Sequence, residues 1–174
     1  MLIKLLLKLI KALNSNASPK QLAHGFALGA ILGLTPALSL HNILILLIIY
    51  ILHVNIPIAI VSALLYKIIA ILLSGYAHKL GLFILVAEPL QSLWTTMYNL
   101  PIVPWSRFYN TVVMGSFVIS LILYVPNLFI GKYFVIGYRK YVLTFIEKSK
   151  LAKVLKSSKL YKLYNKYQSV KSEL

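Results

Sequence analysis

The sequence has no cysteine and no aspartate, and its only acidic residues are Glu88, Glu147 and Glu173. A chain without cysteine forms no disulfide and no thiolate metal site, and catalysis by paired carboxylates lacks the residues that it needs. Phosphate-binding loops, nucleophile-elbow motifs and His-Glu-x-x-His are absent as well. We therefore expect a protein that is not an enzyme, with no catalytic residue and no cofactor.

The four histidines, His24, His41, His53 and His78, are the side chains that titrate near neutrality. Their spacing matches no metal-binding motif. We expect structural histidines and no metal, and a four-histidine metal site is the less favoured alternative.

Apolar residues, in contrast, make up 60% of the 174 residues, while charged residues make up only 12%. Soluble domains average roughly 45–50% apolar and about 25% charged residues. A chain this apolar has too little polar surface to cover a soluble globule of its size. The composition therefore predicts an integral membrane protein.

The formal net charge of +15 is concentrated at the two ends of the chain. Residues 1–20 carry four lysines and no acid, and residues 139–174 have a net charge of +8. No charged residue occurs in 21–66 or in 108–131, and apolar runs of this length predict membrane-spanning helices in an all-α fold. Because basic flanks prefer the cytoplasm, we expect a multi-pass protein with both termini cytoplasmic and an even number of full crossings.

Lysines at both ends are expected to bind lipid headgroups. Helical spacing of the first lysines predicts an amphipathic helix in the cytoplasmic interface, and each lysine near an anionic leaflet is worth about 1 kcal/mol. Nucleic acid is the less favoured partner for the tail and is not expected. The lysines concerned are Lys4, Lys8, Lys11, Lys150, Lys153, Lys156, Lys159 and Lys162.

A glycine-rich helical hairpin is predicted for residues 18–55. Gly25, Gly29 and Gly33 recur every four residues and form a groove on one helix face, which we expect to receive a partner protein's transmembrane helix. Thr35-Pro36 breaks the helix and forms the hairpin tip. The first arm, 19–34, would be about 24 Å long, which is short for a span, so a re-entrant hairpin and a pair of short spans both remain open.

The remaining sequence predicts two or more further transmembrane helices and a connector rich in tryptophan, tyrosine and proline on the periplasmic face. The expected segments are an interfacial amphipathic helix at 1–17, the hairpin at 18–55 broken at Thr35-Pro36, a transmembrane helix at 56–87, an interfacial connector at 88–107, a transmembrane helix at 108–146 kinked near Pro126, and a basic, helical cytoplasmic tail at 147–174.

Lys67 and Glu88 are candidate intramembrane charges. Lys67 falls near the middle of an apolar helix, and Glu88 is the only acid of the apolar region. A charge at bilayer depth marks a pathway or a partner, whereas the equally favoured alternative is that Lys67 extends its stem to one surface. A pair between Lys67 and Glu88 is compatible with the sequence, which does not fix their distance.

The segments GFALG at 25–29, GLTP at 33–36 and VNIP at 54–57 resemble an uncharacterised bacterial membrane family, number two thousand and sixty-two among the domains of unknown function. The segment RFYNTVVMGS at 107–116 is similar to a longer subfamily of inner-membrane proteins. The chain departs from the broader family at Lys67, where an Asn-Pro pair is typical. The resemblance implies the inner membrane of bacteria that have an outer membrane, and a gene that is often one of an adjacent pair.

Two functions follow from these observations. The first is a non-enzymatic inner-membrane subunit that anchors or assembles with a larger envelope protein, encoded by the neighbouring gene, in cell-envelope maintenance such as lipid transfer between membranes. The glycine groove, the basic ends and the missing catalytic groups favour it. The alternative is a small transporter or lipid translocase that uses a re-entrant hairpin, with Lys67 and Glu88 as its intramembrane charges.

Overall fold

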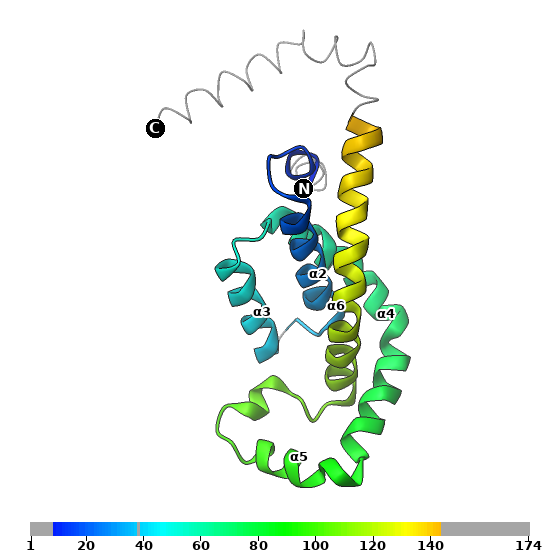
Figure 1. Ribbon diagram of the computed structural model, residues 1–174. Coiled ribbons are helices and arrows are strands. Elements are labelled where there is room, and N and C mark those ends of the chain that lie inside the picture. Colours follow the sequence, from blue (N-terminus) through cyan, green and yellow to red (C-terminus); the bar gives the residue numbers. More distant parts are fainter. Residues whose placement is uncertain (1–8, 38, 144–174) are drawn as a thin grey trace. The chain divides into compact units, whose positions relative to one another are not determined.

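The computed structural model describes residues 9–37 and 39–143 and is helical, without strands, in these residues (Figure 1). The expected all-α fold is confirmed for them. Residues 9–13 are helical, and the elements that follow are α2 (Pro19–Leu34), α3 (Leu40–Ile51), α4 (Ile56–Val86), the short 3-10 helix η1 (Glu88–Leu90), α5 (Gln91–Tyr98), the 3-10 helix η2 (Val103–Ser106), α6 (Thr111–Gly137) and the π-helical turn η3 (Tyr138–Leu143).

Lys4, Lys8 and the five tail lysines, together with most of the segments expected at 1–17 and 147–174, lie outside the described residues. Lys11 is described and is exposed. The chain divides into a unit up to Val135 and a second unit from Ile136.

Among the described residues, two helices are long and apolar enough to cross a membrane, Ile56–Val86 and Thr111–Tyr141, each of 31 residues. By helical rise each is about 46 Å long, against a hydrocarbon thickness of about 30 Å. Only 17% and 33% of their most apolar windows are buried inside the protein, whereas the core helix of a soluble protein would be mostly buried. Apolar surface left uncovered on this scale suits contact with lipid.

Residues next to α2 explain where this helix begins and ends. Ser18 is the N-cap, with its side-chain oxygen accepting a hydrogen bond from the Gln21 backbone N–H at 3.1 Å, and Pro19 occupies the first turn. Thr35, directly before Pro36, is the C-cap in extended conformation. The first arm of the hairpin therefore has the bounds expected for it, and the second arm is α3, which begins at Leu40 and ends at Ile51.

The three glycines of α2 face α4 of the same chain. A Cβ at Gly25 would lie 3.0 Å from the Asn55 carbonyl oxygen, and one at Gly29 would lie 2.8 Å from Ala59 Cα. Because Gly25 meets the start of α4 and Gly33 meets Tyr66 further along it, the two helices run parallel. The groove is filled from within the chain, so the expectation that these glycines receive a partner's helix is corrected.

A second glycine contact joins α4 to α6. A Cβ at Gly81 would lie 2.9 Å from the Gly115 backbone nitrogen, and a Cβ at Gly115 would lie 2.9 Å from the Gly81 nitrogen. The backbones touch because neither residue has a side chain, and Ala77 and Thr111 extend the contact by one turn on each helix. Gly81 meets the start of α6 and Tyr66 meets Asn127, so α4 and α6 are antiparallel.

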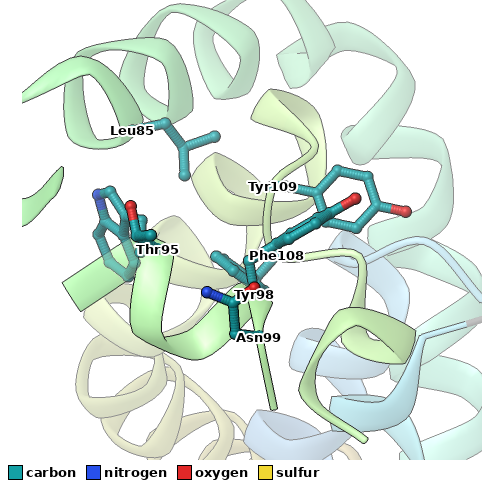
Figure 2. A pocket seen from close by; sticks show the side chains of 7 residues that line it. Leu85, Thr95, Tyr98, Asn99, Phe108 and Tyr109 are labelled. Atoms are coloured by element: carbon teal, nitrogen blue, oxygen red, sulfur yellow. The ribbon is translucent and has the colours of Figure 1, made fainter. Parts of the chain in front are cut away.

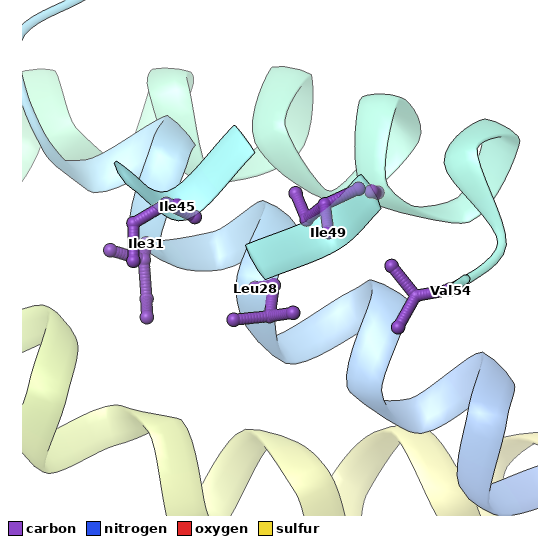
Figure 3. Packing of buried hydrophobic residues seen from close by; sticks show 6 residues of the cluster. Leu28, Ile31, Ile45, Ile49 and Val54 are labelled. Carbon is purple, nitrogen blue, oxygen red and sulfur yellow. The ribbon is translucent and has the colours of Figure 1, made fainter. Parts of the chain in front are cut away.

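A small apolar cluster holds α3 against α2 (Figure 3). Ile45 and Ile49, one turn apart on α3, are buried with Leu28 and Ile31 of α2. The other side of α3 stays exposed. α2 is thus enclosed by α3, α4 and α6, and most of its residues are buried.

We expect Gly29→Ala to destabilise the protein, because the added Cβ would be 2.8 Å from both Ala59 Cα and Ser62 Cβ. Overpacking of this kind costs about 1–3 kcal/mol, so the variant should unfold at a lower temperature in mild detergent. Gly75→Ala is the matched control, since it makes the same exchange in α4 with nothing within 4 Å of the new atom. Equal melting temperatures for the two variants would contradict the packing of α2 on α4.

Candidate functional site: the polar tip of the helical hairpin

The hairpin tip, residues 35–42, gathers polar side chains at the end of an otherwise apolar helix pair. Thr35 has no exposed surface. Its hydroxyl lies 2.8 Å from the Ile31 carbonyl oxygen and 2.6 Å from Asn42 Oδ1, and donates its one proton to either. The last turn of α2 and the first turn of α3 are therefore joined by a buried hydrogen bond.

Asn42 and Ser39 donate hydrogen bonds to backbone carbonyl oxygens in the turn between α2 and α3. Asn42 Nδ2 donates to the Pro36 oxygen at 2.7 Å and to the Ala37 oxygen at 3.3 Å. Ser39 Oγ donates to the same Pro36 oxygen at 2.9 Å. Because non-helical backbone is tolerated at membrane depth only where it is buried in protein or faces water, these contacts are what such a tip requires.

Lys67 of α4 reaches the tip from the neighbouring helix. Its Nζ donates to the Thr35 carbonyl oxygen at 2.9 Å, although the residue as a whole is exposed. Counted from the start of α4 at Ile56, Lys67 is about 17 Å along the helix axis, roughly half the hydrocarbon thickness. The candidate charge and the candidate tip thus form one site.

Glu88 is not part of this site. It begins η1, beyond the end of α4, and most of α4 separates it from Lys67, about 28 Å by helical rise. The pair that the sequence left open between Lys67 and Glu88 is therefore excluded. Within the described residues Glu88 is also the only carboxylate, so the Lys67 ammonium has no acidic partner there.

Each histidine has its own partner. His41 Nε2 is 3.0 Å from Ser39 Oγ, at the tip, and its ring packs on Phe117 of α6 with centroids 4.9 Å apart. The other three lie away from it, with Nδ1 of each in contact with an oxygen. The contacts are His24 with the Tyr124 hydroxyl, His53 with the Ile51 carbonyl and His78 with the Thr111 hydroxyl.

Asn42 is the residue of the site that the sequence did not single out. The signal was present, because Ser39, His41 and Asn42 form a polar group directly before seven consecutive apolar residues and Tyr50. The sequence does not show which way these side chains point. In the structure Asn42 points back to the tip, while Ile43 and Leu44 face outward.

Two apolar helices of spanning length, with a helical hairpin packed against them, define an all-helical protein suited to a membrane. More specifically, the chain belongs to the family described as uncharacterised protein conserved in bacteria (DUF2062), whose model matches residues 4–142. A protein of Treponema pallidum (strain Nichols), itself described as uncharacterised, is 28% identical over 141 residues, which is 81% of this chain and 87% of the relative. No solved structure is significantly similar to the chain. The family resemblance read from the glycine and VNIP segments is confirmed.

We expect Asn42→Ala to weaken the hairpin, because it leaves the Ala37 carbonyl oxygen without its donor and removes two bonds at Pro36 and Thr35. The loss of each hydrogen bond costs about 0.5–1.5 kcal/mol, and the unfolding midpoint in a dodecyl sulfate titration should fall accordingly. Asn16→Ala, at an exposed position before α2, is the matched control. An unchanged midpoint for Asn42→Ala would show that the tip closes without this amide.

Proposed function

We propose that this protein is a small lipid translocase of the bacterial inner membrane, in which the tip of a re-entrant hairpin and Lys67 bind the phosphate of an anionic lipid. The observation that carries the proposal is the hydrogen bond from Lys67 Nζ to the Thr35 carbonyl oxygen. It puts an ammonium group beside a break between two helices, and broken helices form the ion and substrate sites of many transporters.

The charge of Lys67 calls for an anion. A lysine at the bilayer centre costs about 2.5–3.5 kcal/mol, and one hydrogen bond to a charged group returns about 1.5–3 kcal/mol. The bond to Thr35 uses one of three ammonium protons, and no carboxylate of the described residues is within reach. A lipid phosphate would accept the remaining protons and neutralise the charge.

Helix lengths support the re-entrant arrangement. α2 has 16 residues and α3 has 12, about 24 Å and 18 Å, and both are shorter than the hydrocarbon. α4 runs parallel to α2 and continues well beyond the tip. Two full crossings, by α4 and α6, would then leave both chain ends on the cytoplasmic side, where the basic ends favour them.

The first function considered from the sequence, a subunit assembled with a larger envelope protein, loses its structural support because α4 fills the glycine groove. It stays a prediction that rests on the family resemblance, the basic ends and the missing catalytic groups. The outer faces of α3 and α4 are apolar and exposed. Contact with lipid would cover them without a partner protein.

The chain's lack of cysteine permits a direct test of the topology with single cysteines at exposed sites before α2, at the tip and in the connector, namely Asn16, Ala37 and Ser92. We expect a membrane-impermeant maleimide to label Ser92→Cys only from the periplasm and Asn16→Cys only from the cytoplasm. Ala37→Cys should resist labelling from the periplasm. Periplasmic labelling of Ala37→Cys to the extent of Ser92→Cys would mean that the hairpin crosses the membrane.

Translocation is tested in phosphatidylcholine liposomes with a trace of fluorescent phosphatidylglycerol, by dithionite bleaching of the label that reaches the outer leaflet. We expect the protein to expose inner-leaflet label, and Lys67→Met to slow the exchange by about tenfold or more, since a hydrogen bond to a charged group is worth about 1.5–3 kcal/mol. Lys67→Arg keeps the charge and should keep most of the rate.

Lys79→Met is the matched control, because Lys79 is an exposed lysine of the same helix and lies about 18 Å further along it. Equal rates for Lys67→Met and the unaltered protein, or equal rates for fluorescent phosphatidylglycerol and phosphatidylcholine, would overturn the role given to the tip.

A further inference from the structure

The segment that joins α4 to α6 forms a pocket of about 330 Å³ (Figure 2). Small-molecule sites have volumes of about 300–1,000 Å³. Four aromatic side chains line this one, Trp94, Tyr98, Phe108 and Tyr109, together with the polar side chains of Thr95 and Asn99. It is separate from the hairpin tip, because its α4 residue, Leu85, is about 27 Å along the helix from Lys67.

The aromatic rings are held in place before any ligand arrives. Trp94 Nε1 donates to the Ile84 carbonyl oxygen at 3.2 Å, which ties the indole to the last turns of α4. Its ring lies 6.0 Å from that of Phe108, which is buried. Tyr98 and Tyr109 meet edge to face at 5.6 Å. Edge-to-face pairs of this kind stabilise the arrangement, so the pocket is preformed.

Polar groups remain available on the same walls. The hydroxyls of Tyr98 and Tyr109 and the side-chain amide of Asn99 have no hydrogen-bond partner among the residues that the structure describes. The Thr95 hydroxyl donates to the Gln91 carbonyl oxygen at 2.9 Å, which leaves its own lone pairs free to accept. A ligand of this pocket therefore meets ring faces and four hydrogen-bonding groups together.

The walls also carry no charge, which narrows the chemistry of the ligand. A phosphate would enter without a cation to replace its water. A quaternary ammonium binds well to aromatic faces, but it neither donates nor accepts hydrogen bonds and would leave the four polar groups unused. A pyranose ring fits both the aromatic rings and the polar groups. Its C–H face packs on aromatic rings, and its hydroxyls donate and accept hydrogen bonds.

The surroundings of the pocket place this ligand at a lipid surface. Leu100, Ile102 and Trp105, in the same connector, are large apolar side chains that are exposed. Tryptophan and tyrosine prefer the boundary between hydrocarbon and water. A sugar that reaches this position from the membrane is attached to a lipid.

The geometry points to a binding site for the uncharged sugar headgroup of a membrane glycolipid, with Trp94 as a stacking platform and Asn99 and Tyr109 as hydrogen-bonding groups. This site is independent of the translocase function proposed above, since it uses neither Lys67 nor the hairpin.

The two tryptophans of the chain, Trp94 inside the pocket and Trp105 outside its lining, supply the probe and its control. Trp105→Phe leaves Trp94 as the sole emitter, in protein reconstituted in nanodiscs with a rising fraction of monoglucosyl diacylglycerol. We expect a saturable shift of Trp94 emission. Trp94→Phe, which reports on Trp105, should not respond. Asn99→Ala and Tyr109→Phe, each in the Trp105→Phe background, should weaken the response about three- to tenfold, as the loss of one neutral hydrogen bond does.

Titrations with other lipids show which chemical group of the lipid the pocket binds. An equal shift with diacylglycerol that carries no sugar would mean that acyl chains fill the pocket and would overturn the proposal. A shift with phosphatidylcholine in place of the glucosyl lipid would assign the rings to a quaternary ammonium instead. No shift with the glucosyl lipid, with melting temperatures of the variants unchanged, would also overturn it.

Discussion

The backbone contact between α2 and α4 is the constraint on which the rest of the structure depends. Gly29 lets the two helices meet at Ala59 so closely that no side chain fits between them, and Gly25 and Gly33 repeat the contact one turn to either side. Lipid supplies no hydrophobic driving force between helices, so in a membrane close packing and hydrogen bonds would have to hold them together. Here both occur in one interface, because Ser62 Oγ donates to the Phe26 carbonyl oxygen at 2.6 Å. These contacts fix the register of α2 on α4. They therefore also fix the point along α4 at which α2 ends.

That register decides where the polar groups meet. Gly33 lies against Ala63, one helical turn before Lys67, so the end of α2 arrives where the Lys67 side chain can reach the Thr35 carbonyl oxygen. A shift of one turn would separate the two by about 5.4 Å.

The second glycine contact, at Gly81 and Gly115, lies on the part of α4 beyond the tip. It fixes α6 against α4 and so determines where the connector begins and ends. One long helix with glycine contacts near both ends therefore positions the hairpin tip and the aromatic pocket independently.

Patterns with a local physical cause could be read from the sequence. The helix from Pro19 to Leu34 follows from the Ser18 cap and the Thr35-Pro36 break, and the glycine spacing correctly indicated a close helix contact. The identity of the partner could not be read, because a small-residue face is equally suited to a helix of the same chain or of another. The sequence does not predict the contact between Gly81 and Gly115, because neither glycine belongs to a repeat of small residues like the one in α2. Lys67 was recognised as costly, but its acceptor is a backbone carbonyl, which no residue type reveals.

Closing the tip does not by itself account for Lys67. The carbonyl oxygens of Pro36 and Ala37 are paired with Asn42 and Ser39, and the Thr35 hydroxyl pairs within the hairpin. The lysine adds a bond to one further carbonyl, for which a neutral donor would serve without bringing a charge to the end of the hairpin. The charge of Lys67 has no acidic partner among the described residues. In the translocase proposed above, the phosphate of an anionic lipid would be that partner, and no acid of α4 competes with it for the ammonium.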